Sequence, residues 1–270
     1  MGSAAPGTNA GPWRLTDRTR RWMSTHDLFG DRAAEYARHR PSYPEALFEL
    51  LERLAPARAL AWDCGAGSGQ TARSLARRFD RVLASDSSPR QLARAGAHAR
   101  VDFVAAAAEA APIRAHRVDL ITVSAAIHWF DRPAFYAEVR RVARPRAVLA
   151  VWSYFQTRIE PTIDAVLEHY AEDVVGPLWH PGIRLNRGAY RDLEFPFERL
   201  PWPDLHAEGH MRLADLFQYM RTWSASQEWE RRNGTDPVEE VREALERAWG
   251  DPKRERAIRW PLHGMIGRVG

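Results

Sequence analysis

The chain has 270 residues, of which 45% are hydrophobic and 27% charged, and its formal net charge at pH 7 is +4. This composition supplies enough apolar surface for a substantial core and excludes a chain that is disordered throughout. No apolar run approaches the roughly 20 residues that a membrane-spanning helix needs. The sequence also has no stripe of basic residues interleaved with aromatic residues, which would indicate nucleic-acid binding.

The first 25 residues are rich in small, turn-forming and basic residues, and we predict a disordered tail at 1–25 ahead of a single domain at 26–270. They lack the apolar segment of a signal peptide. Helices are expected over 31–40 and 44–54, where apolar residues recur at helical spacing and Pro44 suits a first helical turn.

Strands and helices then alternate with short links. Apolar runs indicate the strands and amphipathic segments indicate the helices. The predicted strands are 57–62, 81–85, 101–105, 118–124 and 146–152, and the predicted helices between them are 70–79, 89–99 and 133–142. Such alternation is typical of an α/β fold, in which helices cover both faces of a parallel sheet. Ligands of these sheets bind at the carboxyl ends of the strands.

The alternation stops after Trp152. Helices are predicted over 160–174, 213–231 and 237–249, strands over 195–200 and 258–262, and irregular chain over 176–190. We interpret 153–192 as an insertion that caps the substrate site above the strand ends.

A glycine-rich turn, Asp63-Cys-Gly-Ala-Gly-Ser-Gly69, links the first predicted strand to the next helix and would let a ligand approach the backbone closely. The turn also fits the dinucleotide pattern G-x-G-x-x-A, so an NAD(P)-dependent oxidoreductase is an alternative. Asp86, at the end of the second strand, would bind ribose hydroxyls in either case. Asp63 favours S-adenosylmethionine (SAM), because its carboxylate would repel a pyrophosphate and attract the ammonium group of SAM.

Several motifs in order resemble those of class I SAM-dependent methyltransferases, and in particular the subgroup of trans-aconitate methyltransferases (methyltransferase type 11). They span about residues 29–153 and comprise the glycine turn with Trp62 before it, Ala108-Glu-Ala-Ala-Pro112, the run Asp119 to Asp131, and an opening helix from Phe29 to Pro44. The resemblance implies a Rossmann-like, mostly parallel sheet with one antiparallel strand near the end, helices on both faces, and a helical, aromatic cap.

The same resemblance implies a set of residues that hold SAM, with Asp63 and the glycines at its methionine end and Asp86 at its ribose. The set is Tyr36, Arg40, Asp63, Gly65, Gly67, Asp86, Ser87, Ala108, Glu109, Ser124 and His128. Ala107 departs from the family, which often has an acidic residue there that reaches the adenine amine.

Methyl transfer from a sulfonium needs no covalent enzyme intermediate, and a base is needed only if the acceptor is protonated. His128 is the first candidate for this base and Tyr36 the second. Aromatic rings stack on flat substrates, and we expect the substrate to contact Phe29, Trp129, Trp152, Trp179, His180 and Trp223. The histidine spacing predicts no metal site.

The expected reaction is therefore methylation of a small molecule. A whole-chain similarity to the N-methyltransferase of azapteridine (toxoflavin) biosynthesis favours N-methylation of a pyrimido-triazine ring in secondary metabolism, as part of toxin biosynthesis. O-methylation of a small carboxylic acid is the alternative, for which Arg184, Arg187 and Arg221 could supply positive charge. A nucleic-acid methyltransferase would carry an Asn-Pro-Pro-Tyr-like motif, which is missing, and a SAM-binding protein without catalysis is the non-enzyme alternative.

The expected partners follow from the same observations. Beyond its small-molecule substrate, the chain is expected to bind neither nucleic acid nor membrane, with a monomer as the default state. Cys64 is the single cysteine, so an internal disulfide is excluded and a cytoplasmic location is expected.

Overall fold

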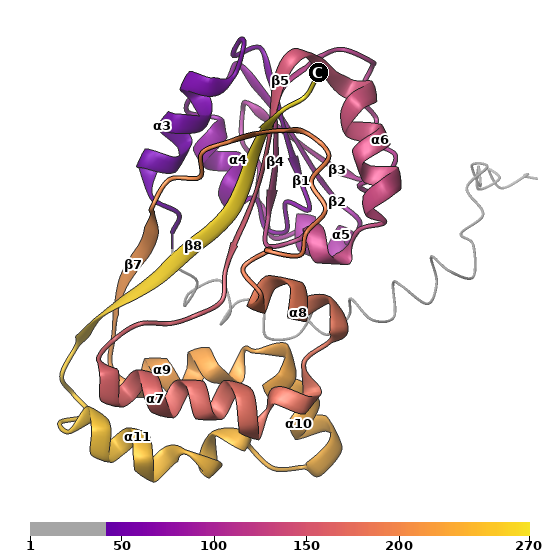
Figure 1. Ribbon diagram of the computed structural model, residues 1–270. Helices are drawn as coiled ribbons and strands as arrows, with labels where there is room; N and C mark the ends of the chain where they lie inside the picture. Colours follow the sequence, from indigo (N-terminus) through magenta and orange to yellow (C-terminus); the bar gives the residue numbers. More distant parts are fainter. Residues whose placement is uncertain (1–41) are drawn as a thin grey trace, which may run out of the picture.

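The computed structural model describes residues 42–270, in which one mixed sheet of eight strands forms the centre (Figure 1). The strand order is β3-β2-β1-β4-β5-β8-β6, and β7 pairs with β8 off this path. The strands are β1 Leu60–Cys64, β2 Arg81–Asp86, β3 Val101–Ala105, β4 Val118–Ser124, β5 Ala143–Tyr154, β6 Glu198–Leu200, β7 His206–Met211 and β8 Arg256–Arg268. β1 to β5 pair in parallel, whereas β8 runs antiparallel to β5, β6 and β7. The predicted α/β class, with a mostly parallel sheet and an antiparallel strand near the end, is confirmed.

Helices cover both faces of this sheet (Figure 1). α3 (Glu45–Leu54) and α4 (Gln70–Leu75) lie on one face and α6 (Arg132–Val142) on the other, while the short α5 (Pro89–Leu92) follows β2. Side chains of β5 alternate between two cores, with Val148, Ala150 and Trp152 in one and Leu149 and Val151 in the other. A strand that is buried on both faces is apolar at every position, which explains the continuous apolar run in the sequence.

A separate layer of helices lies beyond the end of the sheet (Figure 1). It consists of α7 Pro161–His169, α9 Leu213–Arg221, α10 Ser224–Asn233 and α11 Arg242–Trp249, and we call these four helices the helical layer. α8 (Pro181–Arg187) lies between this layer and the sheet. The helical layer thus draws on two segments of the chain, one inside the expected cap 153–192 and one well after it. In residues 42–270, no helix has the length and apolar content to cross a bilayer.

Several predicted boundaries were wrong for identifiable reasons. The helix expected over 89–99 ends at Leu92, because the chain turns there and reverses at Gly96, whose φ is +65°. The stretch expected to be irregular over 176–190 contains α8. The last strand extends to Arg268, well beyond 258–262, and β7 was not expected at all because its sequence, HAEGHM, is polar.

Gly264 allows β8 to approach β5 closely within the sheet. A Cβ atom at this position would overlap the carbonyl oxygen of Val151 and lie 2.7 Å from the ring of Trp202. We therefore expect Gly264→Ala to lower the free energy of unfolding by about 1–3 kcal/mol, because overpacking a filled site forces the backbone to shift. Thermal unfolding measures this loss. Gly176→Ala is the control, since its Cβ would lie an ordinary 3.4 Å from the Ala171 carbonyl oxygen; equal melting temperatures for both variants would contradict the prediction.

Candidate active site

The site is built where the carboxyl ends of β1, β2 and β4 meet. β1 lies between β2 and β4, and Asp63 stands in register with Ala84 on one side and Thr122 on the other. From β1 the chain passes through α4 to β2 on one side of β1, and it later reaches β4 on the other side of β1. Open α/β sheets bind ligands where the strand order reverses in this way.

The glycine turn is held against β2 by its backbone. The N–H groups of Gly65 and Ala66 both donate to the Ser85 carbonyl oxygen, at 2.8 and 3.0 Å. Gly65 and Gly67 have φ values of +71° and +54°, a region that favours glycine. A Cβ at Gly65 would lie 2.6 Å from the Cβ of Ala126, whereas a Cβ at Gly67 would meet no atom of the described residues within 4 Å. Protein packing therefore requires glycine at 65, while the space beside Gly67 is open to a ligand.

Asp63 is a fully buried acid with an unused acceptor. Its Oδ1 accepts a hydrogen bond from the Thr122 hydroxyl at 2.9 Å, and its Oδ2 is buried without a hydrogen-bond partner among residues 42–270. Burial raises the pKa of Asp63 to about 7, although the hydrogen bonds from Thr122 and from the Ala72 backbone oppose this shift. A buried carboxylate oxygen without a donor is costly, and an ammonium group of a ligand would satisfy it.

Asp86 organises the next part of the site. Its two carboxylate oxygens accept the backbone N–H groups of Gly67 and Ser88, each at 2.8 Å, so this carboxylate joins the glycine turn to the end of β2. The Ala106 N–H donates to the Asp86 carbonyl oxygen at 3.1 Å, which brings the 106–109 segment alongside. Ser87 is half-buried, Ala108 is buried, and Glu109 accepts the Asp131 N–H at 2.9 Å. The residues expected around ribose and adenine thus lie next to one another.

The third part of the site follows β4. The Ser124 hydroxyl lies 3.0 Å from that of Thr71 on α4, and the Ala125 N–H donates to the Trp152 carbonyl oxygen at 2.7 Å. Ala125 has a φ of +53°, a conformation that costs a non-glycine residue roughly 1–3 kcal/mol and is often found at functional sites. This turn leads into a 3-10 helix, Ile127–Trp129, which presents His128.

His128 and Trp129 are both half-buried and contact residues far along the chain. The Nδ1 atom of His128 lies 3.4 Å from the Tyr190 hydroxyl. The ring centroid of Trp129 lies 5.0 Å from that of His128 and 4.8 Å from that of His180. A Cβ at Gly182 would lie only 2.9 Å from the His128 carbonyl oxygen, so glycine lets α8 approach this turn closely.

Comparison with known proteins places this geometry in a family. Residues 62–151 match the family described as "Methyltransferase domain". A Dictyostelium discoideum protein that carries a methyltransferase name is 32% identical over 235 residues, which cover 84% of this chain and 89% of that protein. A solved structure from Anaeromyxobacter dehalogenans, described as a type II methyltransferase, is 41% identical with a TM-score of 0.80, covering 85% of this chain and 98% of its own. The chain belongs to the methyltransferase domain family.

Proteins of this family and fold use SAM, and the chain is therefore a SAM-dependent methyltransferase. The oxidoreductase alternative that the glycine turn left open is set aside. The residues of this chain fit the cofactor, because Asp63 offers a buried acceptor to its ammonium group and the backbone at Gly67 leaves room beside the turn.

In the methyltransferase, the residues expected to contact the substrate lie in different parts of the structure. Trp129 and His180 lie together at the turn after β4. Trp152 is fully buried and packs edge-on against Tyr43 at 5.5 Å, so in this structure it belongs to the core. Trp179 and Trp223 are 5.7 Å apart and form part of an aromatic cluster with the helical layer. Phe29, Tyr36 and Arg40 lie outside the described residues.

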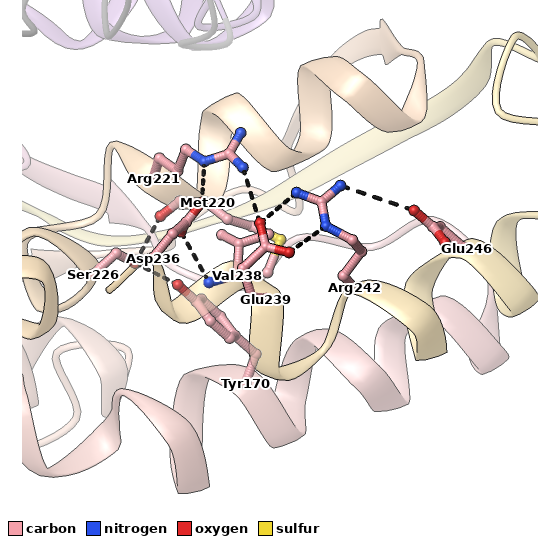
Figure 2. Close-up of polar contacts among 9 residues, drawn as sticks. All are labelled: Tyr170, Met220, Arg221, Ser226, Asp236, Val238, Glu239, Arg242 and Glu246. Carbon is pink, nitrogen blue, oxygen red and sulfur yellow. Dashed lines mark hydrogen bonds and ion pairs between the residues drawn. The ribbon is translucent and has the colours of Figure 1, made fainter. Parts of the chain in front are cut away.

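Two of the arginines considered for an acidic substrate are engaged in ion pairs. Figure 2 shows that Arg221 pairs with Asp236 at 2.7 Å and with Glu239 at 3.9 Å. Arg187 pairs with Glu172, and burial lowers the pKa of its guanidinium. A cation that already holds a carboxylate of its own chain is less available to a carboxylate of a substrate. In residues 42–270, no group of three or more acidic, histidine or cysteine side chains could hold a metal ion.

Two residues of the site environment were missed from the sequence: Thr122 and Tyr190. Thr122 could have been found, because parallel pairing of two predicted strands that both end at the site places it beside Asp63. No sequence pattern indicated Tyr190, because only the path of the chain around α8 brings its hydroxyl close to His128.

Proposed function

We propose that this methyltransferase transfers the methyl group to a ring nitrogen of a flat nitrogen heterocycle, with a pyrimido-triazine of the toxoflavin type as the specific candidate. The proposal includes membership of the trans-aconitate-like subgroup and a role in secondary-metabolite or toxin biosynthesis. We also propose that the enzyme acts in the cytoplasm as a monomer. The 153–192 segment, together with the rest of the helical layer, would cap the substrate.

The observation that supports a flat substrate is the half-buried Trp129, whose ring lies close to those of His128 and His180 at the turn after β4. A planar heterocycle gains both apolar contact and favourable ring geometry on such a surface. The ion pairs of Arg187 and Arg221 weigh against the alternative, O-methylation of a small carboxylic acid.

The residues of the chain would divide the work as follows. Asp63, Asp86 and the glycine turn would bind the cofactor, together with Ser87, Ala108, Glu109 and Ser124. Bound SAM supplies an electrophilic methyl group on a sulfonium, so the reaction is an in-line displacement. The protein would contribute positioning and exclusion of water, and His128 would remove the proton that the acceptor nitrogen loses.

A substrate panel tests this proposal. Purified enzyme with SAM is incubated with flat nitrogen heterocycles, including a demethylated pyrimido-triazine, and with small polycarboxylates, and methylated products are identified by mass spectrometry. We expect N-methylated heterocycles, and a loss of at least tenfold in kcat/KM for Trp129→Ala because the stacking surface is removed. Turnover of polycarboxylates alone would instead establish the O-methylation alternative.

A further inference from the structure

A hollow with a volume of about 490 Å³ opens to solvent at the amino ends of the parallel strands, and we call it the arginine hollow. Its lining residues belong to α6, β6 and β8 or lie beside them, together with the start of β5; they include Arg140, Arg146, Phe197, Glu198, Arg268 and Val269. Arg268 stands in register with Val148, whereas the cofactor site follows Asp63 and Ser124 at the other end of the strands. The end of the chain, which borders the hollow, lies far from α8 (Figure 1). The arginine hollow is therefore separate from the active site.

The arginine hollow concentrates positive charge. Arg140, Arg146 and Arg268 line it, and Glu198 is the one acidic side chain among the described lining residues. Within residues 42–270, none of the three arginines forms an ion pair with a carboxylate. By contrast, Arg78 pairs with several carboxylates at 2.7 to 3.7 Å. Three guanidinium groups around one hollow, without a counter-ion from the described chain, attract an anion.

Hydrogen bonds to the backbone fix two of these guanidinium groups in place. Nη1 of Arg268 donates to two carbonyl oxygens, at 2.7 and 3.1 Å, the second of which belongs to Arg146. Nη2 of Arg140 donates to the Pro196 carbonyl oxygen at 3.2 Å, and its guanidinium carbon lies 4.9 Å from the ring centroid of Phe197. Both side chains keep further N–H groups for a ligand, because a guanidinium has five. Groups that are already held in place lose little freedom on binding an oxyanion.

Arg146 adopts a backbone conformation that costs stability. Its φ is +64°, in the left-handed region that favours glycine. Its side chain is exposed and forms no hydrogen bond or ion pair within residues 42–270, so no polar contact there offsets the cost. Residues in disfavoured conformations are often found at binding sites, where their side chain is needed for function.

We propose that the arginine hollow binds a small molecule that carries more than one phosphate group. Guanidinium groups match phosphate oxygens with paired N–H donors and stay charged throughout the physiological pH range. The three arginines come from α6, β5 and β8, so one polyphosphate would join three elements that are distant in sequence. A ligand that binds only the folded chain in this way stabilises it.

Pyrophosphate is the probe that tests this site. The full chain is first saturated with S-adenosylhomocysteine, so that the cofactor site is filled, and pyrophosphate is then titrated at low ionic strength by isothermal titration calorimetry. We expect a one-to-one complex with a Kd below about 1 mM and a melting temperature that rises with pyrophosphate concentration.

Arg146→Gly is the decisive variant, because glycine suits a φ of +64° and the substitution removes the charge without adding strain. Its melting temperature without pyrophosphate should equal or exceed that of the wild type, while its affinity for pyrophosphate should fall about tenfold or more. Arg140→Gln is a second variant and should also weaken binding. Arg247→Ala is the control for net charge, since Arg247 is exposed on α11 and pairs with Glu243 at 3.5 Å; it should bind as the wild type does.

Three results would overturn the proposal. The first is a saturated wild-type enzyme that does not bind pyrophosphate. The second is an affinity of Arg146→Gly equal to that of the wild type, or an equal loss in Arg247→Ala. The third is tighter binding of citrate or of a short DNA duplex than of pyrophosphate, which would assign the arginine hollow to carboxylates or to nucleic acid. The titration needs no methyl acceptor, so failure of the heterocycle panel leaves its outcome unaffected.

Discussion

Asp63→Asn is expected to weaken the binding of S-adenosylhomocysteine at least tenfold, which is about 1.4 kcal/mol. The amide can still accept the hydrogen bond from the Thr122 hydroxyl, so the fold should be retained. The buried Oδ2 that now lacks a donor would be replaced by an amide NH2 group or by an uncharged oxygen, and neither attracts an ammonium group as a carboxylate does. Isothermal titration calorimetry measures the change.

Asp119→Asn is the matched control for this prediction. Asp119 is also fully buried on a neighbouring strand, but it accepts the backbone N–H groups of Ala59 and Leu60 and pairs with Arg144 at 3.2 Å near the opposite end of the sheet. Its neutralisation should lower stability and leave ligand affinity unchanged. If Asp63→Asn binds S-adenosylhomocysteine as tightly as the wild type, the assignment of Asp63 to the cofactor is wrong.

The affinity of the wild-type enzyme should also depend on pH. Burial raises the pKa of Asp63 to about 7, above its ordinary value of 3.8, so the carboxyl is largely protonated below pH 7 in the free enzyme. An ammonium group binds the ionised form, and affinity should therefore rise with pH up to about 7 and then level off. Below pH 7 binding should release protons, which calorimetry in buffers of different ionisation enthalpy detects. Asp63→Asn should remove this part of the pH dependence.

Gly67→Ala should abolish most cofactor binding, with a loss of at least tenfold in affinity for S-adenosylhomocysteine. The added methyl group would meet no atom of residues 42–270 within 4 Å, so it would occupy the space that we assign to the ligand. Gly234→Ala is a close control, because Gly234 has a φ of +70° and ends α10 far along the chain. A Cβ there would likewise meet nothing within 4 Å in the part of the chain that the structure describes. Each substitution should cost about 1–2 kcal/mol of stability from its left-handed backbone.

Thermal unfolding of Gly67→Ala and Gly234→Ala measures the cost of backbone strain, and calorimetry measures the loss of ligand affinity that an occupied cofactor space causes. Similar melting temperatures with a large difference in affinity are the expected result. If Gly67→Ala and Gly234→Ala bind the ligand equally well, the space beside Gly67 is not part of the cofactor site.

The sequence predicted the cofactor half of the protein well because its information is local. Glycines with left-handed φ, an acidic residue at the end of an apolar strand, and a following amphipathic helix all lie within a few positions of Asp63. Parallel pairing then follows from the alternation of strands and helices, and it brings Asp86 and Ser124 to the same edge of the sheet.

The arrangement of the substrate-side residues depends on contacts between distant parts of the chain, which short-range sequence patterns do not reveal. Tyr190 meets His128 across 62 positions of sequence. β8 was predicted too short, because Gly264 and Gly267 interrupt its apolar pattern and are required there by close neighbours. Trp152 was expected at the substrate, yet strand alternation places it on the same face as Val148 and Ala150, within the core. That alternation was visible in the sequence and could have been used.

β8 is one continuous strand of 13 residues that pairs with three other strands, β5, β6 and β7. Its residues 262–268 pair with β5. Its residues 256–261 follow α11 directly and pair with β7, the strand that leads into α9. A hinge between the sheet and the helical layer would have to break this strand, so the two parts should unfold as one cooperative unit and show similar protection from hydrogen exchange along the whole of β8. Substrate entry then requires local movement of side chains and loops, such as those around α8, and not the opening of the helical layer as a rigid lid.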